Sequence, residues 1–141
     1  MSIYVITHKK FTPIVKDDFY KNLLVGVDNG NQGEKNYLKD NSNDNISKKN
    51  ASFCELTGMY WLWKNSNDAI IGITHYRRYF LKRRFSKKFL SEKNIKKNLK
   101  IYDIILPKKS YLDGLTMKDQ FKKYHSEEIW KKCGSIIAND C

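Results

Sequence analysis

The sequence predicts an α/β fold, a sheet with helices on both faces that forms one domain over residues 1–141. Three short apolar runs, at 3–7, 69–74 and 101–106, are typical of strands. Helical patterns or long crossovers separate these runs, as in a sheet covered by helices. A length of 141 residues suits one domain, and a hydrophobic fraction of 40% is that of a folded protein.

The first third of the chain begins with a strand and continues into a polar loop. The first apolar run is β-branched and ends in polar residues that include His8 and Lys9. Pro13 breaks any helix in the next segment, and 23–27 is a candidate for a short second strand. Residues 28–50 are rich in Asn, Asp, Gly, Ser and Lys, which predicts a long polar loop. A loop of this length in a compact domain is usually functional or disordered.

A helix is predicted over residues 51–64. Apolar side chains cover most of its circumference, so we expect it to be largely buried. Gly58 in its middle indicates the close approach of another backbone. Cys54 is expected to pack there as a small hydrophobic residue with a reduced thiol. The three cysteines are an odd number at wide spacing, which fits neither a disulfide framework nor a zinc site.

The central strand, 69–74, runs directly into a cationic and aromatic group. His75, Tyr76, Arg77 and Arg78 follow it without a break. In open α/β sheets, ligand sites lie at the carboxyl ends of the strands, so this group is placed to bind an anion. An extended segment alternates its side chains, and we therefore expect only one of the two arginines to face the ligand.

Positive charge is concentrated just beyond this strand. The net charge is +12, and residues 76–100 hold 11 of the 27 basic side chains. The basic segment 81–100 is compatible with a solvated surface, with docking on an anionic membrane through Phe85 and Phe89, or with nucleic-acid binding. Nucleic-acid binding is the least favoured of the three, because the sequence contains no recognised nucleic-acid module.

The C-terminal half carries signals for one strand and three helices. Ser91 is placed to cap a short helix, and Pro107 ends the strand predicted at 101–106. Thr116 and Ser126 are placed to cap two further helices. No apolar run is long enough to cross a membrane, and the amino terminus lacks a signal peptide, so we expect a cytoplasmic protein.

Several stretches together resemble a family of bacterial capsular and exopolysaccharide glycosyltransferases. They are IYVITHKK at 3–10, DNISKKN at 44–50, CELTGMYWLWKN at 54–65, GITHYRRYF at 72–80 and YDIILP at 102–107. These blocks occur in the order and spacing of the family and cover nearly the whole chain. The Glu-Leu-Thr-Gly and His-Tyr-Arg-Arg blocks are the most specific parts of the match.

The resemblance implies a glycosyltransferase of GT-A type. Its sheet would be Rossmann-like and would bind a nucleotide-sugar donor, which we expect to be a UDP-sugar. The acceptor would be a growing surface glycan on a lipid carrier, which suits a protein peripheral at the inner face of the membrane. Members of the family look considerably longer than this chain, whose part after 124–125 is short. We therefore expect an incomplete fold and a truncated transferase, and no catalytic residue is predicted.

With such a donor, we expect the diphosphate to meet side chains at the ends of two strands, namely His8, Lys9, His75, Tyr76, Arg77 and Arg78. For His8 and Lys9, an ordinary exposed basic turn is the alternative. The arginines would take over part of the work of a metal ion, because no Asp-x-Asp motif follows a comparable strand. No metal ligand is predicted, although a divalent cation is compatible with this class. The alternative is that one arginine pairs with a carboxylate and the other is solvated.

Three further residues are candidates for contacts with the nucleotide or the sugar. Asp44 and Asn45 in the polar loop supply acceptors and donors for the base or ribose. The alternative is that Asn45 or Ser47 caps the following helix. A carboxylate on a buried helix must be paired, so Glu55 should face a cation or the ligand. An ion pair with one of the arginines is slightly favoured over sugar binding.

Overall fold

The computed structural model describes residues 1–82, 88–108 and 114–139. Its contacts divide the chain into two compact units, Met1–Ile105 and Leu106–Cys141. Each unit is described separately below, and one domain over 1–141 stays a prediction. Within the described ranges, no helix is long and apolar enough to cross a membrane.

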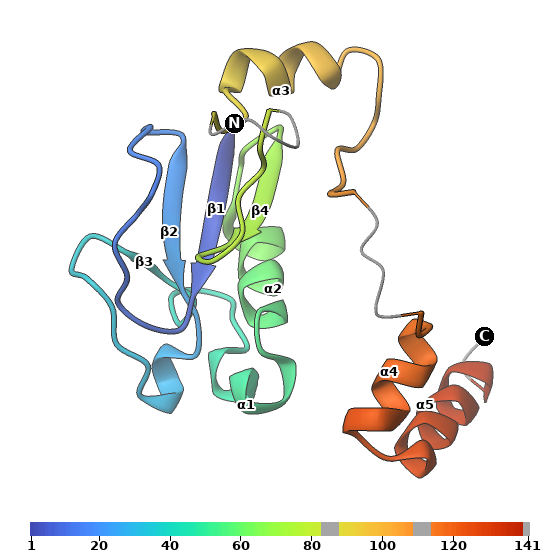
Figure 1. Cartoon of the computed structure of the whole chain (residues 1–141). Coiled ribbons are helices and arrows are strands. Elements are labelled where there is room, and N and C mark those ends of the chain that lie inside the picture. The colour runs from blue at the N-terminus through green and yellow to red at the C-terminus, as the bar shows by residue number, and fades with distance from the viewer. Residues whose placement is uncertain (83–87, 109–113, 140–141) are drawn as a thin grey trace. The chain divides into compact units, whose positions relative to one another are not determined.

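The first unit contains a parallel four-stranded sheet with the order β3-β2-β1-β4 (Figure 1). The strands are β1 (Ser2–Thr7), β2 (Tyr20–Leu24), β3 (Leu38–Lys39) and β4 (Ile71–His75). All six residues of β1 are buried, because β1 pairs with a strand on each side. The predicted α/β class and the strands at 3–7 and 69–74 are confirmed, while the second strand begins three residues earlier than predicted.

Short helices lie between these strands and, in the case of α3, after the last of them. They are η1 (Val27–Asn29), η2 (Ser47–Lys49), α1 (Asn50–Phe53), α2 (Leu56–Asn65) and α3 (Glu92–Asn98). The segment predicted as a polar loop therefore includes β3, η2 and most of η1. Ser91 caps α3 as predicted, because its hydroxyl accepts a hydrogen bond from the backbone of Asn94.

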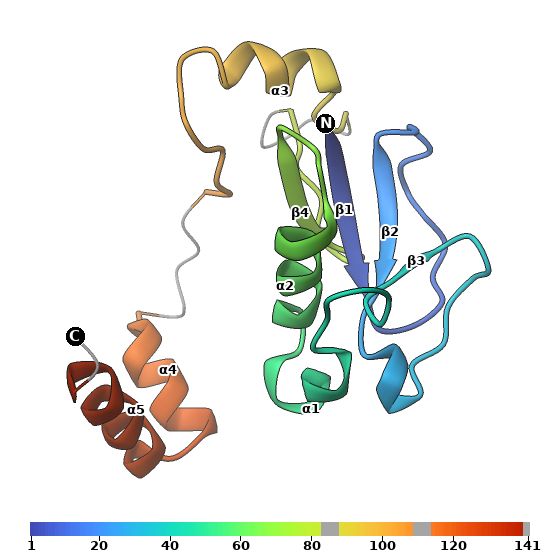
Figure 2. The same ribbon diagram turned by 180° about the vertical axis from the view of Figure 1, so that it is seen from behind.

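Helix α2 packs against one face of the sheet (Figure 2). The shared core consists of Tyr4, Ile6, Leu23, Val25, Trp61 and Leu62. A Cβ atom at Gly58 would lie 2.9 Å from Cγ1 of Val25, so glycine is needed for this close packing. The predicted close approach is present, but it is made by side chains of the sheet and not by another backbone.

The other face of the sheet carries an aromatic cluster. The ring of Tyr79 lies 6.0 Å from that of Tyr20 and 5.6 Å from that of Phe89. The hydroxyl of Tyr20 donates a hydrogen bond to the carbonyl of Leu90 at 3.3 Å. Phe85, which the sequence assigns to a membrane-docking segment, lies outside the described residues.

The helix predicted over 51–64 is broken, and that prediction is wrong. The backbone of Cys54 has φ 46° and ψ −125°, which ends α1 and lets α2 begin two residues later. The side-chain amide of Asn50 stabilises this break by donating to the carbonyl of Cys54 at 2.7 Å. The side chain of Asn50, just before the predicted helix, thus offers the carbonyl of Cys54 a hydrogen bond in place of a helical one, which a pattern of apolar residues does not reveal.

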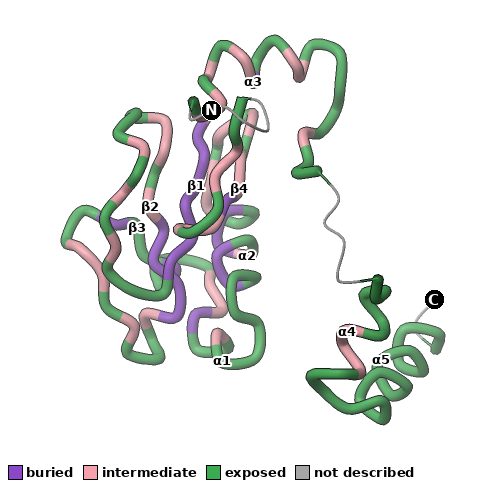
Figure 3. The backbone as a smooth tube through the Cα atoms, viewed as in Figure 1, coloured by how far each residue is buried: buried purple, intermediate pink, exposed green. Residues whose placement is uncertain are grey.

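The predicted deep burial of this segment is also wrong. Thr57, Gly58, Trp61 and Leu62 are the buried residues of α2, while Trp63 is 71% exposed (Figure 3). The sheet covers only one face of the helix, and no described segment covers the other. Cys54 is exposed, so it does not pack as a small hydrophobic residue.

No strand forms at 101–106, contrary to the sequence prediction. The last turn of α3 continues past its assigned end, because the amide of Tyr102 donates to the carbonyl of Asn98 at 3.0 Å. Ile101 is 74% exposed and Ile104 is 66% exposed. An apolar β-branched run needs a neighbouring strand to become part of a sheet, and no described strand pairs with residues 101–106.

The second unit contains a pair of helices, α4 (Met117–Tyr124) and α5 (Glu127–Asn139). The rings of Phe121 and Trp130 pack at 5.4 Å, and Lys122 pairs with Glu127 at 2.7 Å. Thr116 and Asp119 form a capping box at the start of α4. Ser126 caps α5, as predicted, by accepting a hydrogen bond from the backbone of Ile129 at 3.1 Å.

A fully buried carboxylate, that of Asp40, joins three parts of the first unit. One carboxylate oxygen accepts from the amide of Gly26 at 2.9 Å and from the hydroxyl of Thr57 at 2.8 Å. The other accepts from the hydroxyl of Ser47 at 2.6 Å and from the amide of Val27 at 3.3 Å. The end of β2, the helix η2 and the start of α2 are therefore held by one side chain.

Replacing Asp40 by Asn should lower the free energy of unfolding by about 3 kcal/mol, because an amide nitrogen cannot accept these bonds and leaves buried donors unpaired. The measurement is urea unfolding followed by circular dichroism. Asp103→Asn, at an exposed position, is the matched control and should change the free energy by less than about 0.5 kcal/mol. Equal stability of the two variants would contradict this role for Asp40.

Candidate functional site

The candidate site lies at the carboxyl ends of β1 and β4. From β1 the sheet is built outwards to β2 and β3 on one side, and β4 is then added on the other side of β1. The direction of winding therefore changes between β1 and β4, and ligands of open α/β sheets bind at such a point. Ile6 is in register with His75, and the amide of Tyr76 donates to the carbonyl of Ile6 at 3.0 Å. This register brings the residues that follow each strand to the same edge of the sheet.

Tyr76 is the centre of the group. Its ring lies 5.6 Å from the ring of His8 in an edge-on arrangement. The ammonium nitrogen of Lys9 is 5.7 Å from the centroid of this ring, and Cζ of Arg77 is 5.3 Å from it. The cations from two strand ends are thus gathered around one aromatic ring. Their contact with a donor diphosphate stays a prediction.

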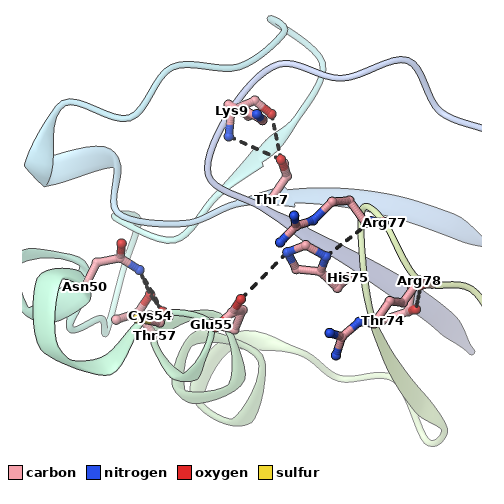
Figure 4. Close-up of polar contacts among 10 residues, drawn as sticks. All are labelled: Thr7, Lys9, Asn50, Cys54, Glu55, Thr57, Thr74, His75, Arg77 and Arg78. Carbon is pink, nitrogen blue, oxygen red and sulfur yellow. Dashed lines mark hydrogen bonds and ion pairs between the residues drawn. The ribbon is translucent and has the colours of Figure 1, made fainter. Parts of the chain in front are cut away.

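The two arginines point in different directions, although the segment is not extended. Residues 76–77 form a turn, which is closed by a hydrogen bond from the amide of Arg78 to the carbonyl of His75 at 2.8 Å. The hydroxyl of Thr74 also donates to the carbonyl of Arg78. Figure 4 shows Arg77 extending past the His75 ring, while the side chain of Arg78 points to the other side. The predicted alternation along an extended segment is therefore the wrong reason for their separation.

His75 pairs with Glu55 across this edge. Nε2 of His75 lies 3.7 Å from Oε1 of Glu55, and Nδ1 accepts a hydrogen bond from the amide of Arg77 at 3.2 Å. Burial lowers the pKa of His75, and the nearby charges of Arg77, Arg78 and His8 lower it too, against the opposing effect of Glu55. The neutral ring thus carries its proton on Nε2, facing the carboxylate.

Glu55 differs from its prediction in two respects. Its side chain is 55% exposed, so it is not a carboxylate on a buried helix face. Its partner is the ring of His75, and not one of the two arginines as the favoured alternative held. The break at Cys54 explains both findings, because it places Glu55 at the end of α2 nearest to His75 (Figure 4).

Asp40 supports this position of Glu55 through a short series of hydrogen bonds. Thr57 donates to Asp40, and the amide of Asn50 donates both to Thr57 at 2.9 Å and to the carbonyl of Cys54 at 2.7 Å. The sequence prediction includes none of Asp40, Thr57 and Asn50. One signal was available: Thr57 is four residues before Trp61, and thus on the same face of α2 as a core residue.

Asp44 and Asn45 do not contact this group in the described structure. Asp44 accepts from the hydroxyl of Tyr60 at 3.0 Å and lies 4.0 Å from the ammonium of Lys64, and both partners belong to α2. The side chain of Asn45 accepts from the amide of Ser47 at 3.1 Å and so forms the turn before η2. Asn45 does not cap η2, because Ile46 is the N-cap residue and no side chain caps the helix. A nucleotide contact stays a prediction for both residues.

The described residues at this edge do not form a complete set of metal ligands. Among the described residues, no group of three or more His, Cys, Asp or Glu side chains is close enough to hold a metal ion. His75 and Glu55 supply two such groups, and the other charged side chains here are cations. The chemistry considered below therefore uses only the side chains of this chain.

Comparison with known proteins identifies the family. A family model described as "Domain of unknown function (DUF4422)" matches residues 2–141. The chain belongs to the DUF4422 family. A search of curated proteins gave no match.

A solved structure resembles this DUF4422 chain closely enough to compare folds. It is the apo structure of WbbM, a bifunctional glycosyltransferase, with a TM-score of 0.68 and 30% sequence identity. The match covers 86% of this chain and 25% of the WbbM chain, so the DUF4422 chain spans about a quarter of the length of WbbM. The α/β fold thus resembles that of part of a glycosyltransferase, which agrees with the family resemblance in the sequence.

The protonation of His75 can be measured directly. We expect its midpoint, followed by proton NMR of the ring, to lie below the ordinary value of 6.5, because burial disfavours the charged ring. The native pKa of His75 lies below that of the unfolded chain. The contribution of His75 to stability is therefore full above pH 6.5 and is lost as the pH falls from 6.5 through the native pKa.

Glu55→Gln should lower this midpoint further, because it removes the charge that favours the protonated ring. Asp18→Asn is the control, since Asp18 is exposed and precedes the opposite end of β2, and it should leave the midpoint unchanged. A midpoint above 6.5 in the native chain, or no response to Glu55→Gln, would contradict the assigned environment.

Proposed function

We propose that this chain is part of a glycosyltransferase and binds the diphosphate of a nucleotide-sugar donor at the carboxyl ends of β1 and β4. The observation that carries the proposal is the cluster of Lys9 and Arg77 around Tyr76, next to His8 and His75. Glycosyl transfer from such a donor releases a diphosphate anion, which cations must stabilise. The structural match to a glycosyltransferase supports this choice among anionic ligands.

The two main cations have different parts in this proposal. Arg77 would form paired, charge-assisted hydrogen bonds with phosphate oxygens, because its planar guanidinium matches their geometry. Lys9 would act as a point charge from the neighbouring strand. Tyr76 would hold both cations near its ring, so that part of the site is formed before the donor binds. The guanidinium of Arg78 lies on the other side of His75 from that of Arg77 and would contribute mainly through its longer-range field (Figure 4).

Glu55 and His75 would bind the sugar side of the donor or acceptor. A neutral His75 with its proton on Nε2 would orient the carboxylate of Glu55 towards the edge of the site. Because half of Glu55 is exposed, this carboxylate is free to accept a hydrogen bond from a sugar hydroxyl. We assign neither residue as the catalytic base.

The finer identity of the substrates follows from the family resemblance in the sequence. On that basis, we propose a UDP-sugar as the donor and a growing surface polysaccharide as the acceptor. The cations at the site would take over part of the charge stabilisation that a metal ion gives in other enzymes of GT-A type.

A thermal-shift screen with UDP and several UDP-sugars, each with and without a divalent ion, would identify the ligand, because a ligand of the native state raises its stability. Titration calorimetry with that ligand then compares two arginine variants. Arg77→Ala should weaken binding at least about tenfold, through the loss of charge-assisted hydrogen bonds of about 1.5–3 kcal/mol.

Arg78→Ala is the matched control and should weaken binding less than about threefold, because it removes only a charge whose effect on the ligand is screened by solvent and salt. Lys9→Ala should have an intermediate effect. The proposal would be refuted by unchanged affinity in both Arg77→Ala and Lys9→Ala, or by a screen in which no nucleotide raises the melting temperature.

A further inference from the structure

Helix α3 presents an outward face of lysines that continues into exposed apolar residues. Its inward side is marked by Ile95, which is 6% exposed. At about 100° per residue, Lys93, Lys97 and Lys100 lie on the side of the helix opposite to Ile95. All three lysines are exposed. The fourth lysine of the helix, Lys96, is exposed but pairs with Glu92 at 2.6 Å.

Exposed apolar residues follow the lysines, and the first of them, Ile101, continues the same face. The helical hydrogen bonds extend beyond α3, because the amide of Ile101 donates to the carbonyl of Asn98, as does the amide of Tyr102. Ile101 is therefore one turn beyond Lys97 and lies on its side of the helix. Ile101, Tyr102 and Ile104 are 74%, 63% and 66% exposed.

The lysines also line a surface hollow. Lys93, Lys96, Lys97 and Lys100 surround it together with Glu92, and its volume is about 580 Å³. Ammonium groups around a hollow of this size suit a phosphate-bearing headgroup, while the exposed isoleucines that follow in the chain suit the boundary between headgroups and acyl chains. We call the exposed residues Lys93, Lys97, Lys100, Ile101 and Ile104 the α3 face.

We propose that the α3 face docks on the surface of a membrane that contains anionic lipids. Lysines near such a surface are attracted by its negative potential, and exposed apolar side chains gain further stability by entering the interface. A nucleic acid would satisfy the lysines but would leave Ile101 and Ile104 in water, so it explains only half of the observations. The face contains no arginine and no aromatic pair for base stacking among its described residues.

The α3 face is separate from the site proposed above. The hydrogen bond from Tyr20, the first residue of β2, to Leu90 fixes the start of the α3 segment at the amino ends of the strands. The cationic cluster around Tyr76 lies at their carboxyl ends, about 20 Å away along β1. Docking would therefore leave the proposed donor site open to solvent, and the two proposals fail or stand independently.

Sedimentation of the full chain with lipid vesicles tests the inference. We expect binding to vesicles of phosphatidylcholine mixed with phosphatidylglycerol, weaker binding at high salt, and little binding to phosphatidylcholine alone. The variant K93E/K97E/K100E should lower the partition coefficient at least about 30-fold, because each lysine near the surface is worth about fivefold. I101D/I104D should lower it about tenfold through the loss of apolar insertion.

K16E/K35E/K48E is the matched control, since it reverses three exposed lysines elsewhere and changes the net charge equally. It should lower the partition coefficient less than about threefold. Circular dichroism and binding of UDP to each variant show that the fold and the donor site are intact.

Three results would overturn the inference. The first is the absence of binding to anionic vesicles by the unaltered chain. The second is an equal loss in K16E/K35E/K48E, which would indicate diffuse attraction of a basic protein. The third is salt-sensitive retention of RNA that competes with vesicles and is insensitive to I101D/I104D, which would assign the face to nucleic acid.

Discussion

The carboxylate of Asp40 is the interaction on which the first unit depends. A buried carboxylate without partners is strongly unfavourable, and here four donors from three segments compensate it. The sheet is small and α2 covers only one of its faces, so apolar burial alone does little to fix the conformation of the segment between β2 and α2. The hydrogen bonds to Asp40 fix it, because Ser47 and Thr57 reach Asp40 only when η2 and α2 are in place.

This network also sets the electrostatics of the candidate site. Thr57 connects Asp40 to Asn50, whose amide holds the unusual backbone at Cys54. The break there places the carboxylate of Glu55 opposite His75, where it is the one described carboxylate paired with this cationic edge. Strained backbone next to a candidate ligand site is a common association in proteins, and here its cause is visible in specific hydrogen bonds.

Local patterns predicted the elements that depend on local forces. The strands at 3–7 and 69–74 and the caps at Ser91, Thr116 and Ser126 were predicted from short stretches of sequence, and so was the meeting of the strand-end cations at one edge. Features that depend on distant partners were not predicted. The break at Cys54 needs Asn50 and Asp40, and the run at 101–106 forms no strand because no described strand pairs with it.

The central claim is that a nucleoside diphosphate binds where β1 and β4 end. Mapping amide chemical shifts by NMR during a titration with UDP tests it most directly, because it locates the ligand without altering the chain. We predict that the largest shifts occur at His8, Lys9, Tyr76 and Arg77, with small shifts in α3. Shifts confined to α3 or to the second unit, or their absence at saturating UDP, would contradict it.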